Sequence, residues 1–310
     1  MRIAKCAAVL AVLPMLTAAK APLHLQPSSK WVLDYADNSC RLLRTFGEGD
    51  DKSTLVIERV APGQALSMLV MGKPFAASRM ARDFTARFAP LDDVKALNGS
   101  AALSSDEGKL PAILWPYMTF QKTIEVKVPT KEMREAMHRA RKGERPPAIE
   151  AALMMQNRIE ERTNASNVKA IEILRGHEAQ VVLDTGSLGT ANRMMDQCAR
   201  DQLSHWGVDP DTEDKIVRRP FAQSPMSWFS YTDYPMESLR KNQESALQVR
   251  LLVDAEGKVT KCTPMTFVAD EAFPKKVCEV FSTRGHFEPA ELADGTKVPS
   301  YYVQRIQFRL

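Results

Sequence analysis

Long apolar runs are absent from almost all of this 310-residue chain. A membrane-spanning helix needs about 20 mostly apolar residues. The longest uncharged apolar stretch, residues 6–17, is shorter, and no other segment comes near that length. Arg2 and Lys5 precede this stretch and small residues follow it, so residues 1–21 are predicted to be a secretory signal peptide. An uncleaved anchor in the inner membrane is the alternative interpretation.

The sequence also has few residues that bind metals, and it has no nucleophile motif. Its five histidines are scattered, and no two cysteines have the two-to-four-residue spacing of zinc sites. Gly-x-Ser-x-Gly, a phosphate-binding glycine loop and a Cys–His signature are all missing. We therefore expect neither a metal nor another cofactor, and no catalytic residues.

Concentrated positive charge is missing as well. The formal charge is +4, and Arg2, Lys5 and Lys20 supply three of these charges, which leaves +1 for residues 22–310. The most basic stretch, residues 131–145, has glutamates interleaved with its lysines and arginines, which favours a solvated helix face. A nucleic-acid footprint needs a concentrated basic face, so no nucleic acid is expected as a partner.

Four cysteines remain if the signal peptide is removed: Cys40, Cys198, Cys262 and Cys278. An even number in an exported chain indicates disulfides. Four cysteines allow three pairings, and the sequence alone does not choose among them. Proximity favours Cys262–Cys278 in the last part of the chain and Cys40–Cys198 in the remainder.

The larger, N-terminal part of the chain alternates strand and helix signals. Alternating apolar residues and turn residues predict an antiparallel meander of strands over residues 31–35, 40–46, 54–60 and 66–71. A further strand over 112–120 contains Pro116, which indicates an edge or a bulge. Helices are expected over 148–162, with Ile159 on the apolar side, and over 188–206. Two more strands are expected over 168–174 and 179–183.

An α+β fold with two domains follows from these patterns. The expected domains are an antiparallel-sheet-plus-helices domain over residues 22–207, of unassigned role, and a small module over residues 231–310. Residues 208–230 contain Pro210, Pro220 and Pro225 among charges, which favours an extended connector.

One tetrapeptide is similar to a catalytic loop. An apolar strand leads into Asp184-Thr185-Gly186-Ser187, which resembles the active-site loop of aspartic proteases. Those enzymes need two aspartates that share a proton, and no second Asp-Thr/Ser-Gly occurs here. Gly186 also suits a tight turn, and Ser187 or Thr185 can cap the following helix. A hydrolase that uses Asp184 is thus the third functional hypothesis.

The last eighty residues carry the clearest pattern. A polar helix begins after Tyr234-Pro235, and a strand with alternating Leu247, Val249, Leu251 and Val253 follows. Gly257 suits a hairpin, and a second strand contains Pro264. Phe273, Val277, Val280 and Phe281 form the stripe of an amphipathic helix before a final alternating strand. The pattern predicts a β-β-α-β module.

These residues resemble the TonB C-terminal domain family. The resemblance covers about residues 234–310 and rests on Tyr234-Pro235, on residues 254–259 at the hairpin, and on Phe287-Glu288-Pro289-Ala290 with Asp294-Gly295. It implies that a short peptide strand of a protein partner, such as an outer-membrane receptor, adds to an exposed sheet edge. The implied partner edge is the last strand, at Tyr301, Val303, Arg305, Gln307 and Arg309. An edge that is only protected by Arg305 and Arg309 is the alternative.

The chain departs from a transducing TonB at its N-terminal side. The apolar N-terminus is short, the 19 prolines are dispersed, and globular sequence stands where a proline-rich spacer would be. We therefore expect an exported, periplasmic binding protein without enzymatic activity or a membrane span after cleavage. A membrane-anchored TonB-type energy transducer in transport is the second hypothesis.

Overall fold

A computed structural model describes most of the chain. The described residues are 21–36, 38–75, 84–91, 97–98, 101–104, 110–120, 151–175, 178–265 and 271–310, with the single positions 131, 135, 138, 139, 142 and 144. The predicted signal peptide, residues 1–21, lies outside the described residues except for Ala21, and so does most of the basic stretch 131–145.

A six-stranded antiparallel sheet contains the predicted meander. Its strand order is β2-β3-β4-β5-β9-β8, and the bounds are Val32–Ala36, Ser39–Phe46, Ser53–Arg59, Leu66–Gly72, Pro111–Met118 and Ala101–Ser104, respectively. The register between β5 and β9 shifts where Leu66 pairs with Met118 and Met68 with Trp115. Pro116 lies in that bulge, as its missing N–H predicts.

A second, five-stranded sheet has the order β1-β11-β10-β6-β7. The bounds are Leu23–Leu25, Glu178–Leu183, Ala170–Arg175, Phe84–Ala89 and Leu97–Asn98. The antiparallel neighbours β10 and β11 are the two strands expected over 168–174 and 179–183. The parallel pairing of β1 with β11 and the insertion of β6 beside β10 join segments that are far apart in the chain, and local patterns carry no information on such pairings.

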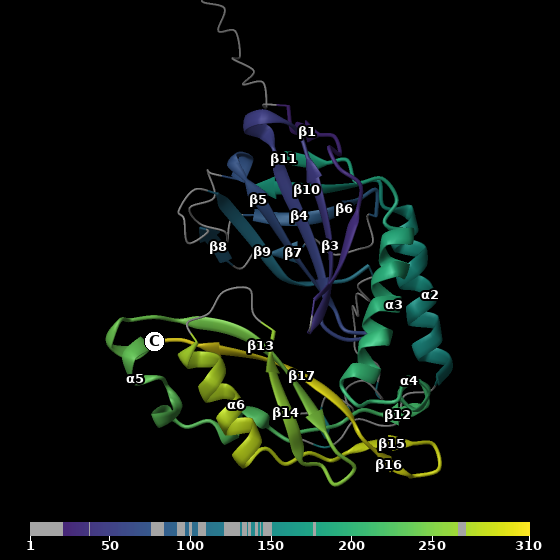
Figure 1. The fold of residues 1–310 in the computed structure, drawn as a ribbon, viewed down its shortest axis with the longest axis vertical. Coiled ribbons are helices and arrows are strands. Elements are labelled where there is room, and N and C mark those ends of the chain that lie inside the picture. Colours follow the sequence, from purple (N-terminus) through teal and green to yellow (C-terminus); the bar gives the residue numbers. More distant parts are fainter. Residues whose placement is uncertain are drawn as a thin grey trace, which may run out of the picture.

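The two sheets and one helix enclose a common core. Leu42 and Trp115 of the first sheet and Ile171 of the second are buried in it, together with Met195 of α3 (Gly189–His205). The helix α2 (Ala151–Asn167) lies beside α3, and both reach from the sheets to the C-terminal part of the molecule (Figure 1). We call these two sheets and two helices the N-terminal body.

The helices α2 and α3 differ in how well the sequence pattern predicted their contacts. Ile159, which was expected on the apolar side of its helix, is 55% exposed, so that expectation is wrong. The helix is anchored nearer its end, where the buried Asn164 side chain donates to the Phe120 carbonyl. Cys198 of α3 is bonded to Cys40 of β3, and the bond closes a separation of 158 residues.

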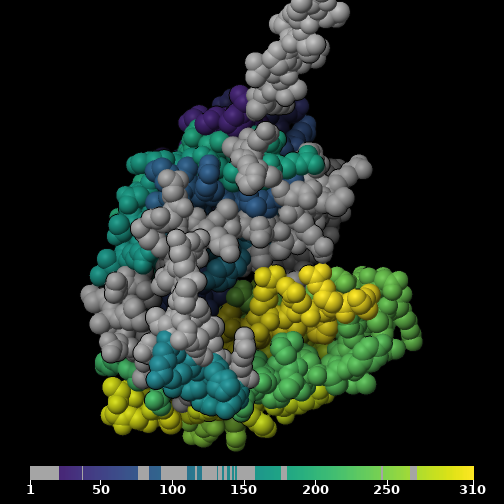
Figure 2. All heavy atoms as spheres, turned by 180° about the vertical axis from the view of Figure 1, so that it is seen from behind, coloured from purple at the N-terminus to yellow at the C-terminus, as the bar shows by residue number. Residues whose placement is uncertain are grey.

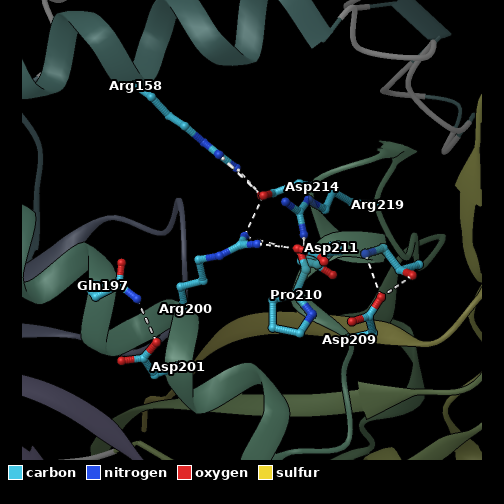
Figure 3. Close-up of polar contacts among 11 residues, drawn as sticks. Arg158, Gln197, Arg200, Asp201, Asp209, Pro210, Asp211, Asp214 and Arg219 are labelled. Carbon is cyan, nitrogen blue, oxygen red and sulfur yellow. Dashed lines mark hydrogen bonds and ion pairs between the residues drawn. The ribbon is translucent and has the colours of Figure 1, made fainter.

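Residues 208–230 differ from the expected extended connector. They contain α4 (Pro210–Glu213), β12 (Ile216–Arg218) and the 3-10 turn η4 (Pro225–Trp228). Aspartates of this segment accept hydrogen bonds from Arg158 of α2 and Arg200 of α3 (Figure 3), which fastens α4 to both helices. Tertiary pairing overrides the proline-rich composition, because β12 finds a partner strand in β15.

The C-terminal module, residues 231–310, has the predicted β-β-α-β order. Its main elements are β13 (Ser245–Val253), β14 (Val259–Pro264), α6 (Ala272–Arg284) and β17 (Ser300–Phe308). Short elements complete it, namely η5 (Tyr231–Asp233), α5 (Met236–Arg240), β15 (Ala290–Leu292) and β16 (Lys297–Val298). The main sheet is antiparallel in the order β14-β13-β17. The mixture of helices and sheets in the whole chain confirms the α+β class.

The module has its own hydrophobic core between α6 and one face of this sheet. Phe273, Val277 and Phe281 of α6 pack with Leu247 and Val249 of β13. Cys278 of α6 is bonded to Cys262 of β14, so the helix is also covalently attached to the sheet. Both disulfides thus have the pairing that proximity in the sequence favours.

The geometry of the hairpin between β13 and β14 explains why residue 257 is a glycine. The Asp254 side chain accepts from the backbone N–H groups of Glu256 and Lys258, which closes the turn. Gly257 has a φ of +84°, and a Cβ at this position would collide with the Phe287 carbonyl oxygen. Only glycine fits here, and the hairpin therefore packs directly against the segment that leads to β15.

Asp233 joins the start of the module to α6. Both of its carboxylate oxygens accept from Arg284, at 2.7 and 3.0 Å, and the backbone N–H of Ser230 donates to one of them at 2.8 Å. The hydrogen bonds from Arg284 hold the pKa of Asp233 well below its usual value, against the opposing effect of burial.

We expect acid to destabilise the module through this group. In the unfolded chain Asp233 takes up its proton near pH 4, whereas the folded state resists protonation, so its contribution to stability is present above about pH 4 and is lost as the pH falls further. Urea unfolding of wild type and Asp233→Asn between pH 6 and 2.5 measures this. The variant should be less stable at pH 6, and the difference should shrink toward pH 2.5. A difference that stays constant with pH would contradict the assignment; the exposed Asp201→Asn substitution is the control.

Candidate partner-binding edge strand

β17 lies at one edge of the module's main sheet. Within the described part of the chain it pairs with β13 along its whole length and with no strand on its other side. Of the residues implied by the family resemblance, Tyr301, Val303, Arg305 and Gln307 alternate along the strand and so share the sheet face opposite α6, and Arg309 follows the last strand residue, Phe308. An open edge presents unpaired backbone N–H and C=O groups.

The same residues also direct their backbone polar groups to the open edge. In an antiparallel pair, the N–H and C=O of one residue point to the same side, and that side alternates along the strand. The C=O of Gln248 accepts from the N–H of Met265 at 2.7 Å, so it points away from β17. Its partner in the register is Arg305. The N–H and C=O of Arg305 therefore point outward, and so do those of Tyr301, Val303 and Gln307.

The upstream half of β17 is covered by the N-terminal body. Tyr301 is 2% exposed, its hydroxyl donates to the Pro62 carbonyl at 2.6 Å, and its ring packs edge-on against Trp206. Burial raises the pKa of the Tyr301 hydroxyl. Val303 packs at the border of the same apolar cluster. Among the five implied residues, Tyr301 therefore has its side chain buried against the N-terminal body and is not accessible to a partner.

Arg250 of β13 is the central contact between the module and the body. It is 1% exposed, and its guanidinium lies 3.4 Å from the centre of the Trp206 ring. It donates to the backbone carbonyls of Asn38 and Val60, at 2.7 and 3.0 Å. Burial lowers its pKa to about 10, so it is still charged at neutral pH. We call the contact made by Arg250, Tyr301 and Trp206 the seam.

The β4–β5 turn of the body accepts hydrogen bonds from both sides of the seam. The module contributes Arg250 to the Val60 carbonyl and Tyr301 to the Pro62 carbonyl. The body contributes Arg59, 1% exposed, to the Gln64 carbonyl at 3.0 Å. Arg59 is itself held by the carboxylates of Glu161 and Asp196, and burial raises the pKa of Asp196. The turn is therefore fixed by buried cations.

The segment from α4 to β12 adds a third contact beside the seam. Ser300 is fully buried and donates to Glu213 at 2.7 Å. Glu213 also pairs with Arg219, whose guanidinium lies 5.4 Å from the centre of the Tyr301 ring. Sequence reasoning missed Arg250, Glu213 and Arg219, because a charged residue on a strand or in a connector is normally solvated.

The downstream half of β17 is open. Arg305, Gln307 and Arg309 are exposed, and the last residues of the chain, in yellow, lie at the surface below the body (Figure 2). Arg309 forms an ion pair with Glu244 at 3.0 Å. Partial burial and the nearby charge of Arg309 lower the pKa of Arg305. The structure therefore divides the implied edge into a covered and an accessible half.

The Asp184 loop is occupied by structural contacts. Asp184 accepts a hydrogen bond from Gln26 and lies 3.5 Å from a ring nitrogen of His24, both near the start of the described chain. The Thr185 carbonyl accepts from Arg44, and Ser187 Oγ accepts from the N–H of Gly189 at the start of α3. No second aspartate approaches Asp184 among the contacts of the described residues, so they supply no carboxylate pair of the protease type.

Neither a metal site nor a membrane-spanning helix occurs in the described part of the chain. Its residues hold no group of three or more His, Cys, Asp or Glu that could bind a metal ion. Within the same ranges, no helix combines the length and the apolar character required to cross a membrane.

Comparison with known proteins gives a match to a family model. Residues 230–310 match the family model described as Gram-negative bacterial TonB protein C-terminal. No curated protein and no solved structure matched the chain. The match confirms the resemblance of the C-terminal module, and it indicates a TonB-like envelope protein linked to transport. The matched family is a non-enzymatic energy-transducer domain.

Proposed function

We propose, from the TonB C-terminal match of residues 230–310, that this chain is an exported, periplasmic binding protein. Its C-terminal module binds an extended segment of a protein partner, such as an outer-membrane receptor, by addition of a strand to β17. The N-terminal body orients the module through the seam. The protein acts as a binding component and not as an enzyme.

The open edge of β17 is the observation that carries this proposal. The strand pairs only with β13 among the described strands, and outward-pointing backbone groups coincide with exposed side chains at Arg305 and Gln307. An added strand gains affinity from main-chain hydrogen bonds and specificity from alternate side chains. The Gln304 side chain donates to the Arg305 carbonyl at 2.8 Å, in the place that the N–H of an added strand would take.

The test uses a substitution that removes one outward N–H. Proline at position 307 deletes that donor and leaves the β13–β17 hydrogen bonds in place, because Gln307 points its N–H to the open edge. A photocrosslinking residue at Leu310 should form an adduct with a partner in periplasmic and outer-membrane extract. We expect Gln307→Pro to reduce the adduct about tenfold, while Gln307→Ala, which retains the N–H, does not.

A second crosslinking position controls for nonspecific capture. Lys275 is exposed on α6, away from the edge, and a photocrosslinking residue there should give no adduct with the same partner. If Gln307→Pro and Gln307→Ala crosslink equally well, strand addition at β17 is wrong. The mature mass and the cell fraction of the protein test the export part of the proposal, and an intact N-terminus in the inner membrane would contradict it.

A further inference from the structure

We propose that the partner of β17 presents a carboxylate side chain to Arg305, and that it pairs only with the downstream half of the strand. This inference rests on the proposed function and adds the chemistry and the extent of the partner segment. Figure 2 shows the last residues of the chain at the surface that would receive it.

The groups that cover the start of β17 limit how much of the strand a partner can pair with. Ser300 is fully buried and Tyr301 is 2% exposed, and both are hydrogen-bonded to groups outside the main sheet, Glu213 and the Pro62 carbonyl. Arg219 lies over the Tyr301 ring. A partner side chain on this face would have to displace the seam. The first position where an outward backbone pair and an exposed side chain coincide is Arg305, and Gln307 is the second.

The chemistry follows from the charges on the accessible half. Arg309 has a carboxylate partner, Glu244, 3.0 Å away. Arg305 has no ion pair with any described residue, and its positive charge is partly desolvated beside a second arginine, which lowers its pKa. A cation in this setting gains from a bound anion more than a fully solvated one does. The carboxylate of Glu244 is thus paired with Arg309, and Arg305 is the arginine of this half that has no counter-charge among the described residues.

An added strand that carries a carboxylate side chain can pair with the charge of Arg305 and with the backbone groups of the edge at the same time. In an added strand, the residue opposite Arg305 has its side chain on the same face, at the distance of a cross-strand pair. Opposite charges there stabilise the pair, and a guanidinium can bind a carboxylate through two hydrogen bonds. A free anion could neutralise Arg305, but it would give the outward N–H groups of Arg305 and Gln307 no strand to pair with.

The experiment selects binding peptides from random sequences, so it does not require an identified partner. A phage-displayed library of random octapeptides is panned against the full chain and, in parallel, against Arg305→Gln. Wild type should enrich peptides of alternating β-branched residues with Asp or Glu at a fixed position. Synthetic copies should bind Arg305→Gln about tenfold more weakly, and they should bind Lys275→Gln, an exposed control on α6, as they bind wild type.

Two further outcomes separate this inference from the function on which it rests. Enriched peptides that lack an acidic residue, bind Arg305→Gln normally and fail to bind Gln307→Pro would overturn the carboxylate preference and leave strand addition standing. Enriched peptides that bind Gln307→Pro as tightly as wild type would overturn both. Hydrogen exchange measures how much of β17 is paired. New protection confined to the outward amides of Arg305 and Gln307 is expected, and new protection at Tyr301 would overturn the restriction to the downstream half.

Discussion

Replacement of Cys40 and Cys198 by alanine is expected to lower the free energy of unfolding by about 5 kcal/mol. The bond closes a separation of 158 residues, and on the chain-entropy model the loss of such a crosslink enlarges the conformational freedom of the unfolded chain. Both cysteines are fully buried, one on β3 and one on α3, so the bond also fastens the helix to the sheet. Urea unfolding followed by circular dichroism measures the change.

The shorter disulfide provides the matched comparison. Cys262 and Cys278 are 16 residues apart, and the same model gives about 3 kcal/mol for their replacement by alanine. A smaller effect for Cys40–Cys198 than for Cys262–Cys278 would show that the unfolded chain is restricted by other means, and it would contradict the expectation.

The substitution Arg250→Met is expected to cost about 4 kcal/mol. It leaves the buried Val60 carbonyl and the partly buried Asn38 carbonyl without this donor, and a buried acceptor that loses its partner costs about 1–3 kcal/mol. It also removes the cation that lies on the Trp206 ring, an interaction worth roughly 1–2 kcal/mol when desolvated. Methionine retains most of the side-chain volume, so cavity formation contributes little. Chemical denaturation gives the magnitude.

The location of the amides that lose protection from hydrogen exchange distinguishes a seam contact from a general core contact. Hydrogen exchange should become faster in the β4–β5 turn and at Tyr301, while the amides of α6, on the other face of the sheet, should keep their protection. Arg240→Met, at an exposed position of α5, is the control and should change stability by less than about 0.5 kcal/mol. If Arg250→Met were as stable as that control, the seam would not hold the module.

Local patterns predicted the parts of the fold that depend on near neighbours in the chain. Strand alternation at Leu247, Val249 and Leu251 identified the face that α6 covers, and the turn residues at Asp254 and Gly257 identified the hairpin. The meander β2–β5 followed from the same two signals. These predictions succeeded because side-chain period and turn chemistry are properties of a few consecutive residues.

The same signals were misleading where distant segments meet. Arg250 occupies the polar side of an alternating strand, where a solvent-exposed side chain is expected, yet it is 1% exposed because the β4–β5 turn and Trp206 cover that side. Ile159 lies on the apolar side of its helix in the sequence pattern and is 55% exposed. The pattern of one element shows which side is apolar, but it does not show what another part of the chain places on the polar side.

The candidate edge strand shows the same difference between what a local pattern predicts and what distant contacts decide. The sequence by itself determined that the last strand alternates, and through its motifs it determined the resemblance that led to Tyr301, Val303, Arg305, Gln307 and Arg309. Only the tertiary structure decided that Tyr301 belongs to the seam while Arg305 and Gln307 are accessible. The physical reason is that a strand's own residues fix its two faces and its hydrogen-bonding sides, whereas burial depends on residues such as Pro62 and Trp206, which lie about a hundred or more positions away in the chain.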